Sequence, residues 1–252
     1  SKVAITLDDA GNVVDTKFHV QNLRGFEKFC EGRPVEEMPR TVCHICGICP
    51  WAHHLASSKA ADGCFGLTPP PAALKLRRLM QNIAYVSDKI LNFYFLAAPD
   101  FVIGPDADYS VRNEVGILQA APDIAKKVVH MRHLGAQMLE GFAGRAIHPT
   151  FSVPGGVSKP PTEADRQKMV PSAQELLEFS KFSIKFAKEN VFPKYLDTIK
   201  SLGVIKVGYL GTVSNDGALD FYDGKLRMMK ADGSYEDFAY DQYLDNIGEW
   251  VA

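Results

Sequence analysis

Hydrophobic residues within residues 72–97 recur every three to four positions, which is the spacing of one face of an α-helix. The repeating residues are Leu76, Leu79, Ile83, Val86, Ile90 and Phe93. This is the longest uninterrupted helical pattern in the chain, and a second long helix is predicted over residues 122–142. Shorter helices are predicted at residues 24–33 and from Pro50 to about Gly66, because proline is tolerated at the first helical position.

Short strands are predicted near both ends of the chain. Residues 3–20 read as two strands joined by the turn-forming run DDAGN. Residues 204–213 and 218–239 read as further strands with tight turns at DG and ADGS. We therefore expect a mostly helical α+β fold with an N-terminal β-hairpin, a long helix-bundle core and additional small β-hairpins near the C-terminus.

Two local signals refine the last third of the chain. Thr162 begins the run TEAD, which resembles a capping box and predicts the start of a helix. Pro171 follows within the same helical pattern and is expected to kink or split that helix. Residues 240–252 read as a final helix.

Composition narrows the class of protein. The chain has 252 residues, of which 46% are hydrophobic and 23% are charged, as is ordinary for a globular protein with a substantial core. A formal net charge of −2 gives no electrostatic argument for binding nucleic acid or an anionic membrane. The sequence contains no run of 18 or more apolar residues and no signal-peptide pattern at its start. We interpret residues 1–252 as a single domain.

The candidate chemistry lies in the stretch TVCHICGICPWAHH, residues 41–54. This stretch contains three of the five cysteines and two histidines: Cys43, Cys46, Cys49, His53 and His54. Three cysteines this close together cannot all bridge one another, so reduced, metal-binding thiols fit better than a disulfide framework. Reduced thiols favour a cytoplasmic setting.

Three kinds of metal site compete for this spacing. The first is a Cys3His zinc site, although four ligands within so short a run would close almost no loop. The second is an iron–sulfur cluster, because the run is close to the bacterial ferredoxin pattern with His53 in place of its last cysteine. In the third, only Cys46 and Cys49 bind metal, as half of a four-thiolate site. Spacing alone does not separate the second from the third.

Other residues of the run have simpler interpretations. Cys43 is expected to be a packed small hydrophobe, and His54 a solvated neighbour. Gly47 is expected to relieve backbone strain in the turn between the two metal-binding cysteines.

The wider sequence supplies the missing context. Four stretches occur in order: RGFEKFCEGRP, CGICPWAHHLASSKAAD, KILNFYFLAAPDF and GRAIHPTFSVPGG. Together they resemble the large subunit of nickel–iron hydrogenases over essentially the whole chain. The family's first signature, Arg-x-Cys-Gly-x-Cys-x-x-x-His, is matched by Cys46, Gly47, Cys49 and His53. The wording of VAITLDDAGNVVD, GRPVEEMPR and ADGCFG is most similar to the cytoplasmic, methyl-viologen-reducing branch linked to heterodisulfide reductase.

This resemblance implies a binuclear site. Cys46 would bind nickel terminally, and Cys49 would bridge nickel to an iron that carries carbon monoxide and cyanide, since soft thiolates suit these metals. His53 would donate a hydrogen bond to the bridging sulfur and so orient a ligand. Asp88 would be a carboxylate in the canopy over the metals. Its helical stripe, which includes Ala84, Leu91 and Phe95, predicts a buried carboxylate among apolar neighbours.

Three further positions matter less for the site. Glu27 matches a recurring acidic residue of the family, although a helix-surface role fits it equally well. His148 matches a histidine near the small-subunit cluster, with a loop-anchoring role as the alternative. His44 stands where the family has an arginine, so whatever that planar bidentate donor holds is altered here.

The implied activity is reversible oxidation of dihydrogen to protons and electrons. Dihydrogen is a very weak acid, so its cleavage needs a Lewis-acidic metal and a nearby base. Electrons would pass to iron–sulfur clusters in a partner small subunit. The family's other Cys-x-x-Cys pair would come from another chain or segment, because residues 1–252 match the N-terminal portion of such a subunit.

A competing hypothesis comes from a different class of protein. The chain would then be a non-catalytic electron-transfer or scaffold subunit with a hydrogenase-like fold. It would bind an iron–sulfur cluster, or no metal, at Cys43, Cys46 and Cys49. The residue that separates the two hypotheses is Cys43, which only the cluster would require.

Overall fold

The computed structural model describes residues 1–20, 25–204 and 206–248. The chain divides into two compact units, Ser1–Lys181 and Phe182–Ala252, and each is described by itself. That residues 1–252 act as a single domain stays a prediction. Within the described residues, none of the helices combines the length and the apolar character needed to cross a membrane.

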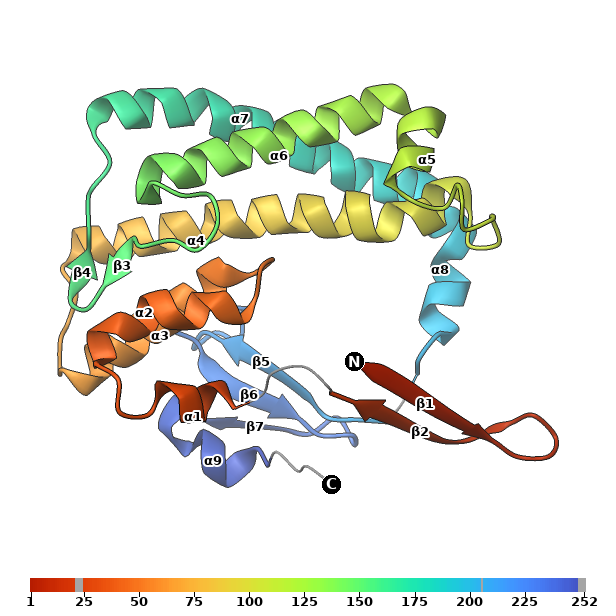
Figure 1. The fold of residues 1–252 in the computed structure, drawn as a ribbon, viewed down its shortest axis with the longest axis horizontal. Helices are drawn as coiled ribbons and strands as arrows, with labels where there is room; N and C mark the ends of the chain where they lie inside the picture. The colour runs from red at the N-terminus through yellow and green to blue at the C-terminus, as the bar shows by residue number, and fades with distance from the viewer. Residues whose placement is uncertain (21–24, 205, 249–252) are drawn as a thin grey trace. The chain divides into compact units, whose positions relative to one another are not determined.

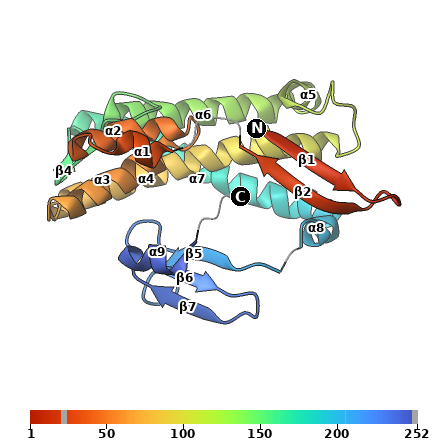
Figure 2. The same cartoon turned by 60° about the horizontal axis from the view of Figure 1, so that its bottom comes forward.

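Three helices that lie side by side form the core of the first unit (Figures 1 and 2). They are α4 (Pro71–Leu91), α6 (Pro122–Ala143) and the first part of α7 (Glu163–Phe186). Phe179 of α7 lies against Tyr94, with 5.4 Å between ring centroids. The predicted mostly helical α+β fold with a long helical core is therefore confirmed.

Close packing of α4 on α6 depends on one glycine. A Cβ atom added to Gly135 on α6 would lie 2.9 Å from the Ser87 hydroxyl on α4, which is closer than such atoms approach. Gly135 therefore lets the two helices come together near the level of Asp88. At its end α4 continues as a π-helix, η3 (Asn92–Ala97), so the prediction for residues 72–97 holds with a change of helix type.

The buried face of α4 differs from the predicted apolar stripe. Leu79 belongs to that stripe but is 45% exposed, whereas Arg77 is fully buried. The buried hydrophobic residues of this helix are Ala73, Met80, Ile83, Ala84 and Ile90. A charged residue thus occupies the core side of the longest predicted helix, where hydrophobic spacing alone gives no sign of it.

Short elements surround this core. β1 (Lys2–Leu7) and β2 (Val13–His19) form the predicted N-terminal antiparallel hairpin, in which Lys2 lies opposite His19. Four short helices lead toward the cysteine run: α1 (Phe26–Cys30), the 3-10 helix η1 (Val35–Glu37), α2 (Met38–Thr41) and the 3-10 helix η2 (Val42–Ile45). After the run, α3 (Pro50–Cys64) confirms the helix predicted from Pro50.

The connection from α4 to α6 consists of a second π-helix, η4 (Pro99–Ile103), and α5 (Glu114–Ala120). Asn113 caps α5, because its side-chain oxygen accepts hydrogen bonds from two backbone N–H groups at 3.0 and 3.1 Å. After α6, the Gly- and Pro-rich stretch forms a two-stranded hairpin, β3 (Ser152–Val153) with β4 (Gly156–Val157).

Two predictions about α7 have different outcomes. The capping box at Thr162 is confirmed, since the Thr162 N–H donates to Asp165 at 2.8 Å and the Asp165 N–H donates back to the Thr162 hydroxyl at 3.2 Å. The prediction that Pro171 splits the helix is wrong, because Glu163–Phe186 is continuous. The buried side chains of Leu176 and Phe179 hold the helix in place beyond the missing hydrogen bond.

The second unit contains the end of α7, the π-helix η5 (Ala187–Val191) and α8 (Phe192–Ser201). A three-stranded antiparallel sheet follows in the order β5 (Tyr209–Val213), β6 (Lys225–Met229) and β7 (Tyr235–Phe238). The predicted hairpins near the C-terminus are therefore confirmed.

The last predicted helix is shorter than expected. A 3-10 helix, η6 (Tyr240–Gln242), and α9 (Tyr243–Asn246) occupy its beginning. Residues 249–252, which the prediction also covered, lie outside the described residues.

Candidate metal centre

Cys46 and Cys49 lie in the turn that connects η2 to α3. The Cys46 sulfur accepts hydrogen bonds from the backbone N–H groups of Cys49 at 3.2 Å and of Ile48 at 3.4 Å. Cys49 is the N-cap of α3, and Pro50 occupies the first turn of that helix, so the turn ends where the helix begins. The chain therefore folds back on the first sulfur and brings the second one beside it.

His53, one turn into α3, completes a group of three potential ligands. One ligand atom each from Cys46, Cys49 and His53 all lie within 4.8 Å of one another. Both cysteines and the histidine are partly exposed. The three residues whose spacing marked the signature are thus brought together by local structure, in a place that a metal ion can reach.

A hydrogen bond between the two thiols polarises the pair. The pKa of Cys46 is lowered, chiefly because its sulfur accepts a hydrogen bond from the Cys49 side chain and another from the Cys49 backbone. The same side-chain hydrogen bond, together with burial, raises the pKa of Cys49 to about 11. Cys46 is therefore the thiolate of the pair and Cys49 the thiol, and a metal that binds both must displace the remaining proton.

The role predicted for Gly47 is wrong. Gly47 is not among the glycines with positive φ, and a Cβ atom there would meet none of the described residues within 4 Å. The turn is closed by the hydrogen bonds to the Cys46 sulfur, without a left-handed residue at position 47. Gly47 instead lines a pocket beside the cysteines.

Cys43 lies apart from this group. Its side chain is fully buried, and its sulfur donates a hydrogen bond to the Arg40 carbonyl oxygen at 2.9 Å. Burial raises the pKa of the Cys43 thiol, so this thiol stays protonated more readily than an exposed one. The interpretation of Cys43 as a packed small hydrophobe is confirmed, and the four-ligand zinc arrangement with Cys43 is not formed in this structure.

The prediction that His54 is a solvated neighbour is wrong. His54 is 1% exposed. Its Nδ1 lies 2.8 Å from the Pro39 carbonyl oxygen, and its Nε2 lies 2.8 Å from the Ser152 backbone nitrogen. These partners assign the neutral tautomer in which Nδ1–H donates and Nε2 accepts. Burial, and then the charge of Arg77, lower the pKa of His54 and favour the same neutral form.

Asp88 faces a pocket of about 140 Å³ beside the cysteine turn. Gly47, Ile48, Pro50 and Trp51 line one side of this pocket, and α4 and α6 contribute Asp88, Arg132 and apolar side chains to the other. The Asp88 side chain is 28% exposed and lies 3.0 Å from Lys89, so it is less buried than its helical stripe suggested. Its charge also contributes to raising the pKa of both thiols, which places it electrostatically next to the pair.

Arg132 is a residue of this pocket that the sequence did not indicate. Its guanidinium donates hydrogen bonds to the Ser87 carbonyl oxygen and hydroxyl, both at 2.7 Å. Burial lowers its pKa, and the charge of Asp88 opposes that shift. A cation and a carboxylate therefore share the wall that faces the thiolate pair.

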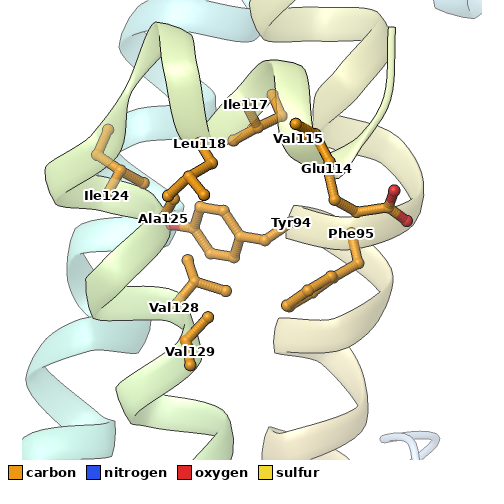
Figure 3. A pocket seen from close by; sticks show the side chains of 10 residues that line it. All are labelled: Tyr94, Phe95, Glu114, Val115, Ile117, Leu118, Ile124, Ala125, Val128 and Val129. Carbon is orange, nitrogen blue, oxygen red and sulfur yellow. The ribbon is translucent and has the colours of Figure 1, made fainter. Parts of the chain in front are cut away.

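A larger pocket of about 220 Å³ lies between the end of α4, α5 and α6 (Figure 3). Its walls are apolar apart from the Glu114 carboxylate and the Tyr94 hydroxyl, and Figure 3 shows the Tyr94 ring lying among the aliphatic side chains of α5 and α6. Functional sites combine an apolar cavity with a few convergent polar groups. That combination occurs beside the cysteines and not here.

The loop after α6 lies against the cysteine run. The Trp51 indole donates a hydrogen bond to the Ala146 carbonyl oxygen at 2.9 Å. His44 and His148 stack with 4.2 Å between ring centroids and 37° between planes, and His148 has a φ of 56°. The position where the family has an arginine thus holds a ring that stacks on this loop. Glu27 is exposed on α1.

Comparison with known proteins gives consistent matches. The family model described as nickel-dependent hydrogenase matches residues 24–115, which include the cysteine run and α4. A subunit of the vhu F420-non-reducing hydrogenase of Methanocaldococcus jannaschii is 47% identical over 252 residues, which are 100% of this chain and 60% of that protein. The beta subunit of the NAD-reducing hydrogenase HoxS of Cupriavidus necator is 33% identical over 99% of this chain and 54% of its own length.

Solved structures agree with these matches. A crystal structure of an NAD+-reducing [NiFe]-hydrogenase in the H2-reduced state superimposes with a TM-score of 0.88 at 35% identity. The match covers 95% of this chain and 54% of that one. A [NiFeSe]-hydrogenase from Dm. baculatum matches with a TM-score of 0.72 at 26% identity, over 94% of this chain and 51% of the other. The chain spans about half the length of the proteins it matches.

Proposed function

The chain belongs to the nickel-dependent hydrogenase family, and we propose that it supplies two of the four thiolates of a nickel–iron centre that oxidises dihydrogen reversibly. The observation that carries this proposal is the grouping of Cys46, Cys49 and His53 within 4.8 Å. Cys43 is fully buried and bonded to backbone outside that group.

The chemistry of the donor set fits such a centre. Two soft sulfur donors lie side by side at a partly exposed turn, with one of them already disposed to be a thiolate. In the proposed centre Cys46 holds nickel terminally and Cys49 bridges nickel to an iron that carries carbon monoxide and cyanide. His53 donates a hydrogen bond to the Cys49 sulfur and so fixes its orientation.

The chain's own residues hold and move the proton. When bound, a nickel–iron centre supplies the Lewis acidity toward dihydrogen and the path for its two electrons. A nickel-bound thiolate or Asp88 then accepts the proton, since Asp88 faces the same pocket as the turn of the two cysteines. Arg132, on the opposite helix, keeps a positive charge near that carboxylate and favours its ionised form between turnovers.

The remainder of the machinery belongs to partners. We propose that a polypeptide matching the rest of the relatives' length supplies the second Cys-x-x-Cys pair, and that a small subunit carries the iron–sulfur clusters that receive the electrons. The similarity to F420-non-reducing hydrogenases supports a cytoplasmic complex, with heterodisulfide reductase as the proposed electron acceptor. Reduced thiols in the site are consistent with that compartment.

The competing function, a non-catalytic subunit with an iron–sulfur cluster, requires a third thiolate from this run. Cys43 is the available candidate, and its burial against the Arg40 carbonyl disfavours ligation. Ligation by Cys43 would require η2 to unwind, because the thiol lies on its buried side. The structure therefore supports the hydrogenase function over the cluster-binding one.

The test compares two cysteines of the same run in the intact complex. Cys49→Ser should abolish both the nickel content and hydrogen-dependent reduction of methyl viologen, because it removes the bridging thiolate. Cys43→Ser should keep nickel at wild-type stoichiometry, since a serine hydroxyl can still donate to the Arg40 carbonyl. If Cys43→Ser removes the metal as completely as Cys49→Ser, the ligand assignment is wrong and the cluster hypothesis replaces it.

A further inference from the structure

The buried face of α3 carries polar side chains instead of hydrophobic ones. His54, Ser58 and Asp62 are spaced four residues apart and therefore lie on one side of the helix. Their exposed fractions are 1%, 0% and 6%. Together with Arg77 of α4, we call these four residues the α3 polar spine.

The upper part of the spine ties α3 to two neighbouring segments. His54 bonds the Pro39 carbonyl of α2 on one side and the Ser152 N–H of β3 on the other, each at 2.8 Å. The Ser58 hydroxyl is placed between the His54 carbonyl at 2.7 Å and the Ser152 carbonyl at 3.2 Å. The first turn of α3 is thus bonded to the helix that precedes the cysteine run and to the hairpin that follows α6.

The lower part of the spine joins α3 to α4. Arg77 reaches both carboxylate oxygens of Asp62, at 2.5 and 3.3 Å, and Asp62 also accepts the Gly155 N–H at 2.7 Å. The same guanidinium donates to the Gly156 and Val153 carbonyls at 3.0 and 2.7 Å. Both helices therefore bond to one template, the β3–β4 hairpin, and α4 is the helix that carries Asp88.

We propose that the polar spine, with His54 as its critical member, fixes the rotation of α3 and thereby sets the position of His53 relative to the Cys46–Cys49 pair. His54 is a positioning residue in this scheme, and the inference rests on the proposed function. Residues 42–49 connect the helix that His54 bonds through Pro39 with the helix on which His54 itself stands. The Pro39 bond thus sets the distance between the two ends of the cysteine turn.

The geometry of a helix shows why rotation matters. Adjacent residues differ by about 100° around the axis, so His53 projects away from the buried face that His54 anchors. A rotation of about 20° moves a side-chain tip at the helix surface by about 2 Å. Misplacing a group by about 1 Å can cost on the order of 100-fold in rate. Loss of the anchor should therefore lower turnover without removing any metal ligand.

Two conservative substitutions separate the two bonds of His54. His54→Asn places an amide near the position of Nδ1 and keeps the bond to the Pro39 carbonyl. His54→Gln places its amide near the position of Nε2 and keeps the bond to the Ser152 N–H. The readout in the intact complex is the frequency of the infrared bands from iron-bound carbon monoxide and cyanide, measured alongside nickel content and turnover.

We expect His54→Gln to shift these bands and to lower turnover about 10- to 100-fold with nickel retained. His54→Asn should keep the wild-type band positions, and it decides the question by itself if His54→Gln does not accumulate. In a His53→Gln background, His54→Gln should add no further shift, because His54 acts through His53. Wild-type bands and turnover in His54→Gln, or shifted bands in His54→Asn, would overturn the proposal.

Ser58→Ala is the matched control for a purely structural role. It removes a buried hydrogen bond one turn further along and leaves the tie between α2 and α3 intact. It should lower thermal stability while leaving the bands in place, and shifted bands in this variant would refute a special role of His54. If the proposed function itself fails, the wild-type complex shows no such bands at all, which is distinct from bands that are present and insensitive to position 54.

Discussion

The two faces of α3 show opposite strategies for polar side chains. His53 and His54 are neighbours in the sequence, yet one lies partly exposed beside two thiols and the other is fully buried with both ring nitrogens bonded to backbone. On the open face, Cys46, Cys49 and His53 keep donor atoms available for a metal. On the buried face, His54 and Asp62 use their donor and acceptor atoms within the protein.

This contrast explains how the site combines access with precision. Ligands for a metal must be reachable, and reachable side chains on a short turn are mobile by themselves. A backing of buried hydrogen bonds supplies the rigidity that the open face lacks. Substitutions on the open face should therefore change chemistry, and substitutions on the buried face should change the free energy of unfolding.

The largest expected effect is on the open face, at Asp88. Asp88→Asn preserves shape and removes a base, so turnover with dihydrogen should fall by about 100- to 10,000-fold with nickel and iron retained. Turnover and metal content measured on the same preparation of the intact complex test this. Loss of metal in proportion to activity would show that Asp88 supports the centre structurally and does not handle protons.

Arg77→Met should have the largest effect on stability. It leaves the Asp62 carboxylate buried without its cation, which typically costs about 3 to 5 kcal/mol in the free energy of unfolding. Urea unfolding of the 252-residue chain measures this. Glu178→Gln, which breaks the exposed ion pair to Lys181, is the control and should change little. An equal loss in both variants would mean that the buried pair has no special role.

Replacing both partners tests the buried pair itself. Asp62→Leu combined with Arg77→Met should be less destabilising than the sum of the two single changes, because no unpaired charge remains buried. Urea unfolding of the two single variants and the double variant gives the three values to compare. Additive losses would argue against direct coupling of the two side chains.

The pH dependence of stability should report His54. Its pKa is lowered in the folded chain, so the unfolded chain binds a proton more readily. The neutral form's contribution is fully present above the unfolded pKa, near the ordinary value of 6.5, and is lost as the pH falls below it. The free energy of unfolding should drop by about 1.4 kcal/mol per pH unit there until the folded pKa is reached. His54→Asn should remove that slope, and an unchanged slope would assign it to other groups.

The smallest expected effect concerns a single bond on the open face. Trp51→Phe removes the hydrogen bond from the indole to the Ala146 carbonyl and keeps most of the ring packing. The free energy of unfolding, measured in urea, should fall by about 1 kcal/mol. A loss as large as that of Arg77→Met would mean that the open face is held as firmly as the buried one.

The open face of α3 could be predicted from the sequence, and the buried face could not. Cys46, Cys49 and His53 lie within one turn and the first helical residues after it, so their proximity follows from spacing, and the resemblance supplied the metals. The helices over residues 72–97 and 122–142 followed from hydrophobic period in the same way. Local patterns therefore identified the elements and the site.

His54 and Arg77 depend on partners that are distant in the sequence. The residue that bonds His54 Nε2 is 98 positions away, and those that bond Arg77 outside α3 are 76 and 79 positions away. A lone histidine or arginine in a helical pattern gives no sign of such a partner. The one available signal was the recurrence of His54, Ser58 and Asp62 every four residues, which marks a polar stripe on α3.

X-ray absorption at the nickel edge of the intact complex is the decisive measurement for the proposed centre, because it reports the atoms around nickel itself. We predict sulfur ligands and one iron as a near neighbour in the wild type, with the iron neighbour absent from whatever nickel a Cys49→Ser preparation retains. Nickel surrounded only by nitrogen and oxygen, or nickel without a neighbouring iron in the fully loaded wild type, would refute the assignment of Cys46 and Cys49.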